Sequence, residues 1–540
     1  MKGRMLASVV MTAIGASLLA AAMFASTASG AGAGSATATA KKGGSLTLVN
    51  RSDFDYVDPG LAYFSHSWNM MGATNLTLLY YPHTEGPARN RLAGMASPMP
   101  RVTNGGKTYT FTIKKGFRFS DGKPVTAANF KRAFDRGKNT AMQSPASSFM
   151  DDIASYSAKG QVFTVTLKQV APDFLARMTM QFFSAVPVNL PFTAEGIKAP
   201  VISAGPYYLK EWNPKNSALA VRNPYWKNNQ EPFKSLGFAA NLDQIRWIVG
   251  PDPATQRLMC ERGEADLCGF PPAQSKELAD KYGINKSQFF VKPQIGNWYL
   301  AMNTSRGIFQ NNVKLRQAVA NAIDRRFMVA QHGYLAGNRS DQFIPMGMPG
   351  FKNFDIYSLK GPNYAKAKPL AQGNTRDGKA VMYTFNTAQG PPIAQSVQFN
   401  LKQIGIDVEI KLFDRVVQHE KTATRGEPFD LTLEGWLADY PDPANFINVL
   451  LDGRRIQADN NVNASYFNDP KYNGRMDQAY KLAGDARTNA YAILDRDIMK
   501  DAAPVAPYIS TSARWLTSTK VGCFQYSGAQ DILWTQICTK

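Results

Sequence analysis

Residues 379–412 restrict the fold of this chain most, because their periodicity changes from that of a strand to that of a helix and back. The segment Lys379–Asn386 (KAVMYTFN) has the composition of a strand. A helix follows, and four apolar side chains mark one side of it: Ile393, Val397, Leu401 and Ile404. Apolar and charged residues then alternate over 406–412, which predicts a second strand. Strand, helix and strand in this order predict parallel pairing in a covered sheet, so we expect an α/β protein.

The first third of the chain has a different texture. Lys107–Ile113 and Gln161–Lys168 alternate as half-buried strands, and a helix is predicted from Thr126 between them, so this part is expected to be largely antiparallel. Another helix is predicted over residues 313–330, with one apolar face: Leu315, Val319, Ala322, Ile323 and Phe327. The sequence has no fixed-period repeat, which argues against a solenoid or a propeller.

The N-terminus has the order of charge and polarity that is typical of exported proteins. Lys2 and Arg4 precede an uncharged apolar stretch, Leu6–Ala25, and small residues follow as far as Ala40. This order predicts a signal peptide cleaved within residues 25–40, although the apolar stretch is also long enough for an uncleaved anchor. The stretch contains no cysteine, so no lipid anchor is expected. The mature chain is expected to be soluble and extracytoplasmic, with a net charge of 20 − 2 = +18.

Export gives meaning to the four cysteines of the chain. Cys260 and Cys268 lie close together in the sequence, and so do Cys523 and Cys538. An oxidising compartment favours a disulfide within each pair, although four cysteines allow three connectivities. Neither spacing is that of a zinc motif and no histidine lies near either pair, so a metal site is not expected.

Composition and motifs argue against catalysis and against nucleic-acid binding. Hydrophobic residues make up 44% of the 540 residues and charged residues 19%, as in a globular protein of several domains. The net charge of +20 permits contact with acidic surfaces, but the basic residues form no long run of the kind that binds nucleic acid. The four histidines are scattered, and no motif for a nucleophile, a metal or a cofactor is present. We therefore expect a binding protein that is not an enzyme and carries no cofactor.

Several segments in a fixed order resemble one family. The first is Tyr109–Arg136 (YTFTIKKGFRFSDGKPVTAANFKRAFDR), a strand, an aspartate–glycine turn and a helix. The later segments are Gly205–Tyr207 (GPY), Asn223–Trp226 (NPYW), Gly263–Asp266 (GEAD), Val313–Arg325 (VKLRQAVANAIDR), Gly435–Phe446 (GWLADYPDPANF) and Asp501–Pro507 (DAAPVAP). Together they resemble the peptide-type solute-binding proteins of ABC importers, the family 5 receptors for oligopeptides, dipeptides and nickel. Asn129 and Lys314 depart from the usual aspartate and arginine of the family at what are expected to be structural helix positions.

The resemblance implies a periplasmic-binding-protein-like fold, in which two lobes close on a ligand like a Venus flytrap and the first lobe carries an extra subdomain. The implied division is a signal peptide and spacer (1–40), lobe I (41–78, 199–292 and 503–540), the appended subdomain (79–198) and lobe II (293–502). The chain would cross the hinge twice, near 293–298 and near 503–507. The resemblance also implies a monomeric periplasmic receptor that captures short peptides between the lobes and delivers them to the permease subunits of an importer.

The resemblance places the ligand against one segment near the end of lobe II. Gly435 leaves room for a ligand backbone, Trp436 offers an apolar face, and Asp439 aligns with the family aspartate that pairs with the free amino terminus of bound peptides. Asp439 could instead begin a turn, because residues 440–443 (YPDP) are rich in turn formers. Trp298 is a weaker candidate for ligand contact, and packing in the core is the alternative for it.

Other functions stay open at this point. The same fold could bind a nickel chelate, haem, an opine, an antibiotic or an oligosaccharide. A secreted hydrolase that uses the cleft is a less favoured alternative. A third is a structural protein whose positive charge adheres to an anionic envelope.

Overall fold

The computed structural model describes residues 41–83, 92–226, 237–529 and 531–540. The predicted signal peptide and spacer, residues 1–40, lie outside the described residues. Within the described ranges, no helix combines the length and the hydropathy that crossing a bilayer requires.

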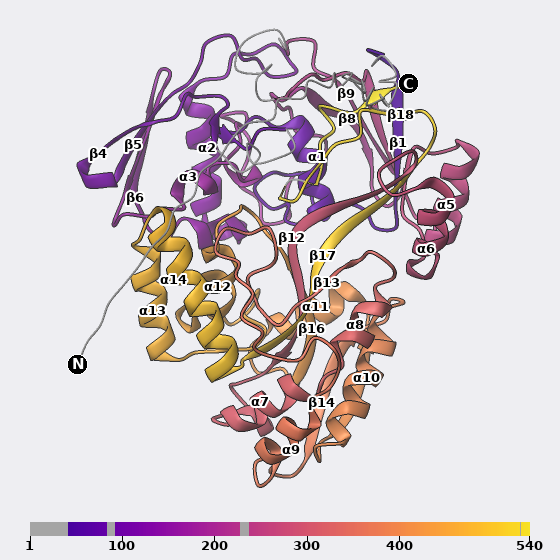
Figure 1. The fold of residues 1–540 in the computed structure, drawn as a ribbon. Helices are drawn as coiled ribbons and strands as arrows, with labels where there is room; N and C mark the ends of the chain where they lie inside the picture. The colour runs from indigo at the N-terminus through magenta and orange to yellow at the C-terminus, as the bar shows by residue number, and fades with distance from the viewer. Residues whose placement is uncertain (1–40, 84–91, 227–236, 530) are drawn as a thin grey trace, which may run out of the picture. The chain divides into compact units, whose positions relative to one another are not determined.

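One mixed sheet of eleven strands runs through the described structure (Figure 1). Ten of its strands, in spatial order, are β15 (Asp407–Phe413), β14 (Lys379–Phe385), β16 (Leu431–Leu437), β12 (Phe289–Met302), β17 (Val505–Thr517), β11 (Leu267–Cys268), β1 (Ser45–Asn50), β10 (Gln244–Val249), β9 (Ser217–Arg222) and β8 (Tyr207–Asn213). The eleventh, β13 (Gly337–Arg339), pairs with β17. Strands from both ends of the sequence meet in this sheet, and helices surround it, so the expected α/β class is confirmed.

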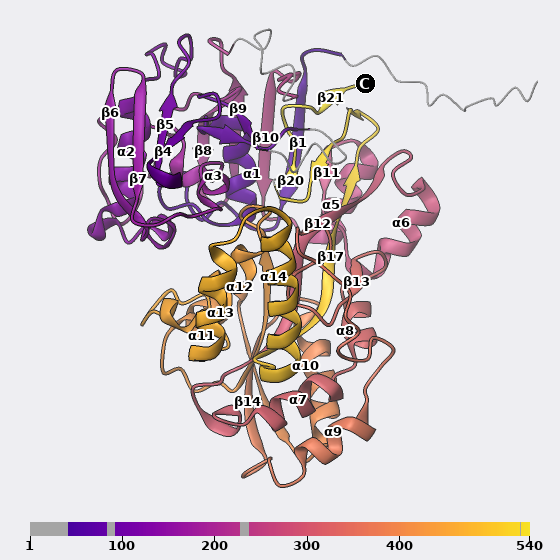
Figure 2. The same ribbon diagram turned by 60° about the vertical axis from the view of Figure 1, so that its left-hand side comes forward.

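The long strands β12 and β17 pair antiparallel and connect the two ends of the sheet (Figures 1 and 2). The predicted hinge crossing near 293–298 falls in β12, and the one near 503–507 lies at the beginning of β17. Their register is irregular at one place: Pro293 lies opposite Ser512, and Asn297 lies opposite Ser510. Three residues of β12 therefore face one residue of β17, which makes a bulge in β12.

The strand–helix–strand unit that the sequence predicts is confirmed. β14 and β15 pair in parallel, from Lys379 opposite Asp407 to Phe385 opposite Phe413, and α10 (Gly390–Lys402) connects them. The predicted stripe of α10 is buried in the core, where Ile393, Val397 and Leu401 have no exposed surface. A right-handed crossover from β14 to β15 fixes the sheet face on which α10 lies, and the apolar stripe is the side of α10 that packs on that face.

The single helix predicted over 313–330 is wrong in one respect, because it is two helices. α7 (Val313–Ala322) ends at Ile323, whose backbone is extended, and α8 (Arg325–Gln331) begins after Asp324. The Asp324 carboxylate accepts a hydrogen bond from the backbone N–H of Phe327 and so caps α8. Phe327, which was expected on the buried face, is 41% exposed because the break turns it outward.

A second, antiparallel sheet lies in the part of the chain that is predicted to be the appended subdomain. Its order is β4 (Arg101–Thr103), β5 (Thr108–Thr112), β7 (Val162–Leu167) and β6 (Ile153–Lys159). The helix α2 (Ala127–Lys138) packs against it through Phe130 and Phe134, which are fully buried. The ring of Phe134 meets that of Phe163 at 5.0 Å. The largely antiparallel arrangement predicted for this region is therefore confirmed.

The other elements surround these two sheets. The helices are α1 (Ser65–Thr74), α3 (Phe174–Arg177), α5 (Pro253–Arg262), α6 (Ser275–Tyr282), α9 (Tyr364–Ala371), α11 (Arg415–Ala423), α12 (Ala444–Leu451), α13 (Pro470–Tyr480) and α14 (Gly484–Asp497). The short strands are β2 (Leu79–Tyr80), β3 (Ala93–Gly94), β18 (Val521–Gly522), β19 (Tyr526–Ser527), β20 (Asp531–Ile532) and β21 (Cys538–Thr539). Both expected disulfides are present, Cys260–Cys268 and Cys523–Cys538.

Candidate ligand-binding site

Among the strands that the structure describes, β16 has a partner along its whole length on one side but over only its first two residues on the other. On one side it pairs with β12 from end to end. On the other side, β14 pairs only with Leu431 and Thr432. Among the described residues, no strand pairs with residues 433–437 on this side. The side-chain amide of Gln418 donates to the carbonyl of Leu433 at 3.4 Å. The backbone N–H and C=O groups beyond Leu433 on this side, the open edge of β16, can accept an extended chain as an added strand.

Asp439 follows this edge and is positioned by the first turn of α12. The side-chain oxygen of Asn445, which is fully buried, accepts from the backbone N–H of Asp439 (3.0 Å) and from the indole N–H of Trp436 (3.1 Å). The side-chain amide of Asn445 donates to Oδ2 of Asp439 (2.7 Å). One buried amide therefore fixes both the backbone and the carboxylate of Asp439.

The Asp439 carboxylate is partly buried, and its hydrogen-bond partners among the described residues are neutral. The hydroxyl of Tyr63 donates to its Oδ2 at 3.1 Å. Burial raises the pKa of Asp439 to about 7, although the hydrogen bonds from Asn445 and Tyr63 act to lower it. Among the described residues, no lysine, arginine or histidine forms an ion pair with this carboxylate. A cation that entered the site would supply the missing charge.

Aromatic rings surround the Tyr63 side of this carboxylate. The ring of Tyr63 has four aromatic neighbours, with centroids 5.3–6.5 Å away: Phe182, Trp68, Trp436 and Phe149. Trp436, which was expected to offer an apolar face to a ligand, faces Tyr63 here with its ring nearly perpendicular. Such apolar surroundings lower the local dielectric and strengthen any charge interaction with Asp439.

Trp298 and Gly435 lie opposite each other on β12 and β16. A Cβ atom added to Gly435 would lie 2.7 Å from the indole of Trp298, so the neighbouring strand alone requires glycine at this position. The guanidinium of Arg415 lies over the same indole, 5.1 Å from the ring centroid, and 5.0 Å from that of Phe385. Trp298 is half-buried in these contacts, which supports the packing alternative for it.

The turn after Asp439 is formed by Asp442. Its Oδ1 accepts from the backbone N–H of Ala444 at 2.9 Å and pairs with Arg487 at 2.8 Å. The carboxylate of Asp439 instead receives the Asn445 amide and the Tyr63 hydroxyl. Both aspartates therefore have hydrogen bonds within this turn, and the turn role of Asp439 and its contact with a ligand both stay predictions.

A cavity of about 420 Å³ lies beside this turn, between residues 148–177 and residues 440–480. Asp173 lines it, accepts hydrogen bonds from the hydroxyls of Tyr440 (2.9 Å) and Tyr480, and pairs with Arg177 (3.3 Å). Burial opposes the ionisation of Asp173, but Arg177 and the two hydroxyls outweigh burial and lower its pKa. This network joins the predicted subdomain to the predicted lobe II.

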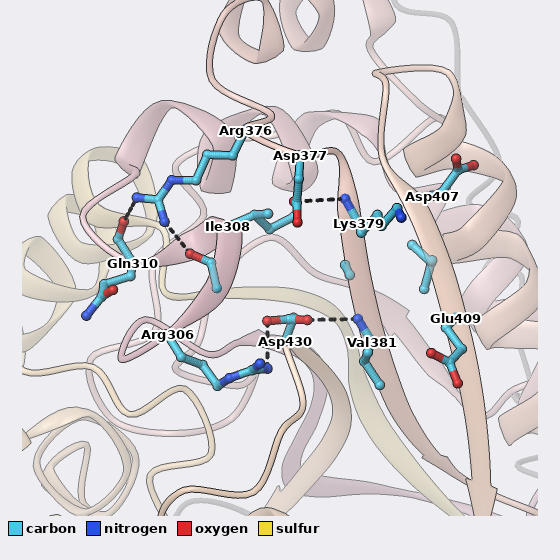
Figure 3. Close-up of a pocket in the computed structure, with 13 residues that line it drawn as sticks. Arg306, Ile308, Gln310, Arg376, Asp377, Lys379, Val381, Asp407, Glu409 and Asp430 are labelled. Carbon is cyan, nitrogen blue, oxygen red and sulfur yellow. Dashed lines mark hydrogen bonds and ion pairs between the residues drawn. The ribbon is translucent and has the colours of Figure 1, made fainter.

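A larger hollow, of about 930 Å³, lies where β14 and β15 begin (Figure 3). Arg306 pairs with Asp430 at 2.9 Å, and Asp430 also accepts from the backbone N–H of Val381 at 2.8 Å. Arg376 donates to the backbone carbonyls of Gly307 and Gln310. These charged groups therefore already have partners within the protein.

The carboxyl ends and the amino ends of the strands differ in what they offer a ligand. In open α/β sheets, ligands bind beyond the carboxyl ends of the strands. Asp439 follows the carboxyl end of β16, whereas the hollow of Figure 3 lies at the amino ends of the parallel strands β14 and β15. Within the described ranges, no group of three or more His, Cys, Asp or Glu side chains is arranged to hold a metal ion. The region around Asp439 is therefore the candidate site.

Sequence reasoning found part of this site. Gly435, Trp436 and Asp439 lie together, and Trp298 packs against Gly435. Sequence reasoning missed Tyr63, which lies 376 positions away from Asp439 and belongs to no recognised motif. It also missed Asn445, although this residue stands in the GWLADYPDPANF segment, where an amide soon after the aspartate was a usable signal.

Comparisons with known proteins bear on the family and the fold of this chain. The family model for bacterial extracellular solute-binding proteins, family 5 (middle), matches residues 92–458. A protein of Escherichia coli (strain K12), named as the probable D,D-dipeptide-binding periplasmic protein DdpA, is 25% identical over 474 residues, which cover 85% of this chain and 87% of that protein.

Two solved structures show the same fold. The periplasmic binding protein DppA of Helicobacter pylori, in complex with the peptide STSA, has a TM-score of 0.79 at 21% identity and covers 92% of this chain and 98% of its own. The binding protein AgaA of A. tumefaciens R10, in complex with agropinic acid, has a TM-score of 0.76 at 19% identity and covers 92% and 98%. The expected two-lobe fold of periplasmic binding proteins is thereby confirmed.

Proposed function

Because the chain belongs to the bacterial extracellular solute-binding proteins of family 5, we propose that it is an ABC-importer receptor that captures short peptides and releases them unchanged to the permease. The observation that carries this proposal is the carboxylate of Asp439. It is partly buried, its pKa is raised to about 7, and no cation among the described residues balances it. The ammonium group of a free peptide terminus has the charge and the hydrogen-bond donors that this carboxylate lacks.

The open edge of β16 supports an extended ligand. A peptide with its ammonium at Asp439 would run along residues 434–437 and exchange backbone hydrogen bonds with them. Four strand residues offer roughly 13 Å of edge, which matches a peptide of about three or four residues. The ligand would then be recognised mainly through its terminus and its backbone.

Closure would make binding visible to the permease. We place Tyr63 in lobe I (41–78, 199–292 and 503–540), Asp173 in the subdomain (79–198), and Asp439 in lobe II (293–502). A ligand that contacts both lobes stabilises the closed state, and a shift from about 1% to 99% closed takes about 5.5 kcal/mol of differential affinity. A micromolar ligand supplies about 8 kcal/mol in total. The receptor would act as a periplasmic monomer.

A second candidate is a non-peptide ligand on the same fold. The structural likeness to AgaA, which is in complex with agropinic acid, favours this alternative over a hydrolase or an adhesive protein. Such a ligand need not carry a free amino terminus. The two candidates therefore differ in their dependence on an ammonium group at Asp439.

Native mass spectrometry with a tripeptide library tests the proposal. The protein is mixed with an equimolar library of unmodified tripeptides and, separately, with the same library acetylated at the amino terminus. We expect adducts of unmodified tripeptides only, with masses unchanged after incubation. Asp439→Asn is expected to weaken binding by about 2–4 kcal/mol, because the buried ammonium loses its counter-charge.

Other outcomes would replace the proposal. Equal binding of both libraries would remove the ammonium role of Asp439, and absence of any tripeptide adduct would favour the non-peptide ligand. Shortened peptides after incubation would establish a hydrolase.

A further inference from the structure

The C-terminal residues 523–529 and 531–538, here called the C-terminal loop, are closed by the disulfide Cys523–Cys538. One part of this loop is anchored in the core of the predicted lobe I. The indole N–H of Trp534 donates to the side-chain oxygen of Asn69 on α1 at 2.6 Å, and the Trp534 ring packs against that of Trp247 on β10. Trp534 is 1% exposed. The loop is therefore fixed on this side.

The other part of the C-terminal loop contacts the bulge in β12. Between Pro293 and Asn297 the pairing with β17 is interrupted, so the backbone N–H of Ile295 has no partner on that strand. The carbonyl of Gly528 accepts from this N–H at 3.1 Å. The side-chain amide of Gln294 also donates to the hydroxyl of Tyr526 at 2.9 Å. Buried backbone donors need such partners, and here the loop provides one.

The hydrogen bonds of Ile295 continue to the candidate site. The backbone carbonyl of Ile295 accepts from the N–H of Ala438 at 2.9 Å, and Ala438 directly precedes Asp439. One residue, Ile295, thus separates the carbonyl of Gly528 from the strand end that carries Asp439. Gly528 fits tightly against the bulge, since an added Cβ would lie 3.1 Å from Cγ1 of Ile295 and 3.2 Å from the carbonyl oxygen of Pro293.

We propose that the disulfide-closed C-terminal loop is a positioning element of the ligand site, which sets the place of Asp439 through the relay from Gly528 to Ile295 to Ala438. This inference rests on the proposed function for its ligand, but the relay itself is a property of the chain. Gly528, Tyr526 and the disulfide Cys523–Cys538 are positioning groups in this scheme and do not touch the ligand. Reduction of this disulfide to two thiols by a dithiol such as dithiothreitol, which is itself oxidised to a disulfide, would release the loop and weaken capture; Cys523 is exposed.

Gly528→Ala tests the relay without breaking a covalent bond. The backbone of Gly528 lies outside the left-handed region, so alanine adds only the contact with the bulge. Gly474→Ala on α13 is the matched control, because an added Cβ there meets no atom within 4 Å. We expect Gly528→Ala to weaken binding of the unmodified tripeptide library about tenfold, the effect of one displaced hydrogen bond, with a near-normal melting temperature. Gly474→Ala is expected to bind like the parent.

Hydrogen exchange followed by mass spectrometry reads the relay without a ligand. In Gly528→Ala and in Cys523→Ser/Cys538→Ser, amide exchange is expected to rise in residues 293–297 and also in residues 436–440. The control is Cys260→Ser/Cys268→Ser, which removes the other disulfide and should leave both segments protected. Faster exchange in 293–297 with unchanged exchange in 436–440 and unchanged affinity would overturn the inference.

The two proposals fail in different ways. If the parent protein binds no tripeptide, the proposed function is wrong, and the exchange data still decide whether the relay exists. If the parent binds tripeptides and Gly528→Ala binds them equally well, the peptide receptor stands and the positioning role falls. If the cysteine variant does not fold, Gly528→Ala and Tyr526→Phe still give the answer.

Discussion

At the residue scale, Asp439 is a partly buried carboxyl group that no cation among the described residues balances. Loss of hydration raises its pKa to about 7, and two neutral hydrogen-bond donors compensate only in part. Ionisation of Asp439 therefore destabilises the folded chain relative to the unfolded one. The same imbalance favours a cationic ligand, so this position exchanges some stability for affinity.

The raised pKa predicts how peptide affinity depends on pH. Binding of an ammonium requires the ionised carboxylate, which is lost as the pH falls below about 7. Calorimetry between pH 7 and pH 5 should show affinity falling by up to about 50-fold, because the ionised fraction of Asp439 falls from about one half to about one hundredth over these two pH units. Asp439→Asn should bind weakly and without this dependence. Constant affinity of the parent over this range would contradict the assignment.

The contribution of Asp439 to folding stability, measured without added peptide, should depend on pH in the opposite sense to peptide affinity. A carboxyl group whose pKa is raised by folding favours the folded state most at low pH, and this contribution is lost as the pH rises through about 7. Asp439→Asn should therefore be more stable than the parent at pH 8, and the difference should shrink towards pH 5. Thermal unfolding of the two proteins at each pH measures this difference. The contributions of the other titrating groups are the same in both proteins and cancel.

At the element scale, the sequence predicts what local periodicity determines. The unit β14–α10–β15 is predicted because the spacing of apolar residues changes from that of a strand to that of a helix and back within one continuous segment. The structure confirms this unit. The apolar spacing over 313–330 continues across the break and therefore predicts a single helix. In the structure, the Asp324 carboxylate caps a second helix within this range. The contact of Tyr63 with Asp439 depends on how distant elements pack, which no local pattern encodes.

The pairing of β12 with β16 predicts a specific coupling between Gly435 and Trp298. Gly435→Ala places a methyl group 2.7 Å from a rigid indole, so we expect a loss of about 1–3 kcal/mol in unfolding free energy, and weaker tripeptide binding. In a Trp298→Leu background the same alanine should cost much less. Chemical denaturation of the four proteins gives the coupling energy, and additive effects would show that the indole does not require glycine there.

At the scale of the whole molecule, two long strands and one polar network control how the parts meet. The predicted hinge crossings lie in β12 and at the beginning of β17, while Asp173 links the predicted subdomain to Tyr440 and Tyr480. Two strand connections permit a hinge bend and restrict other relative motions. The domain boundaries themselves stay a prediction, because they depend on which residues move together.

Small-angle X-ray scattering of the protein, with and without a saturating library of unmodified tripeptides, tests the central claim most directly. If two lobes close on a peptide held by its ammonium, the radius of gyration should decrease with the unmodified library and stay constant with the acetylated one. An identical radius of gyration in all three samples, despite tripeptide adducts in native mass spectra, would contradict capture by closure.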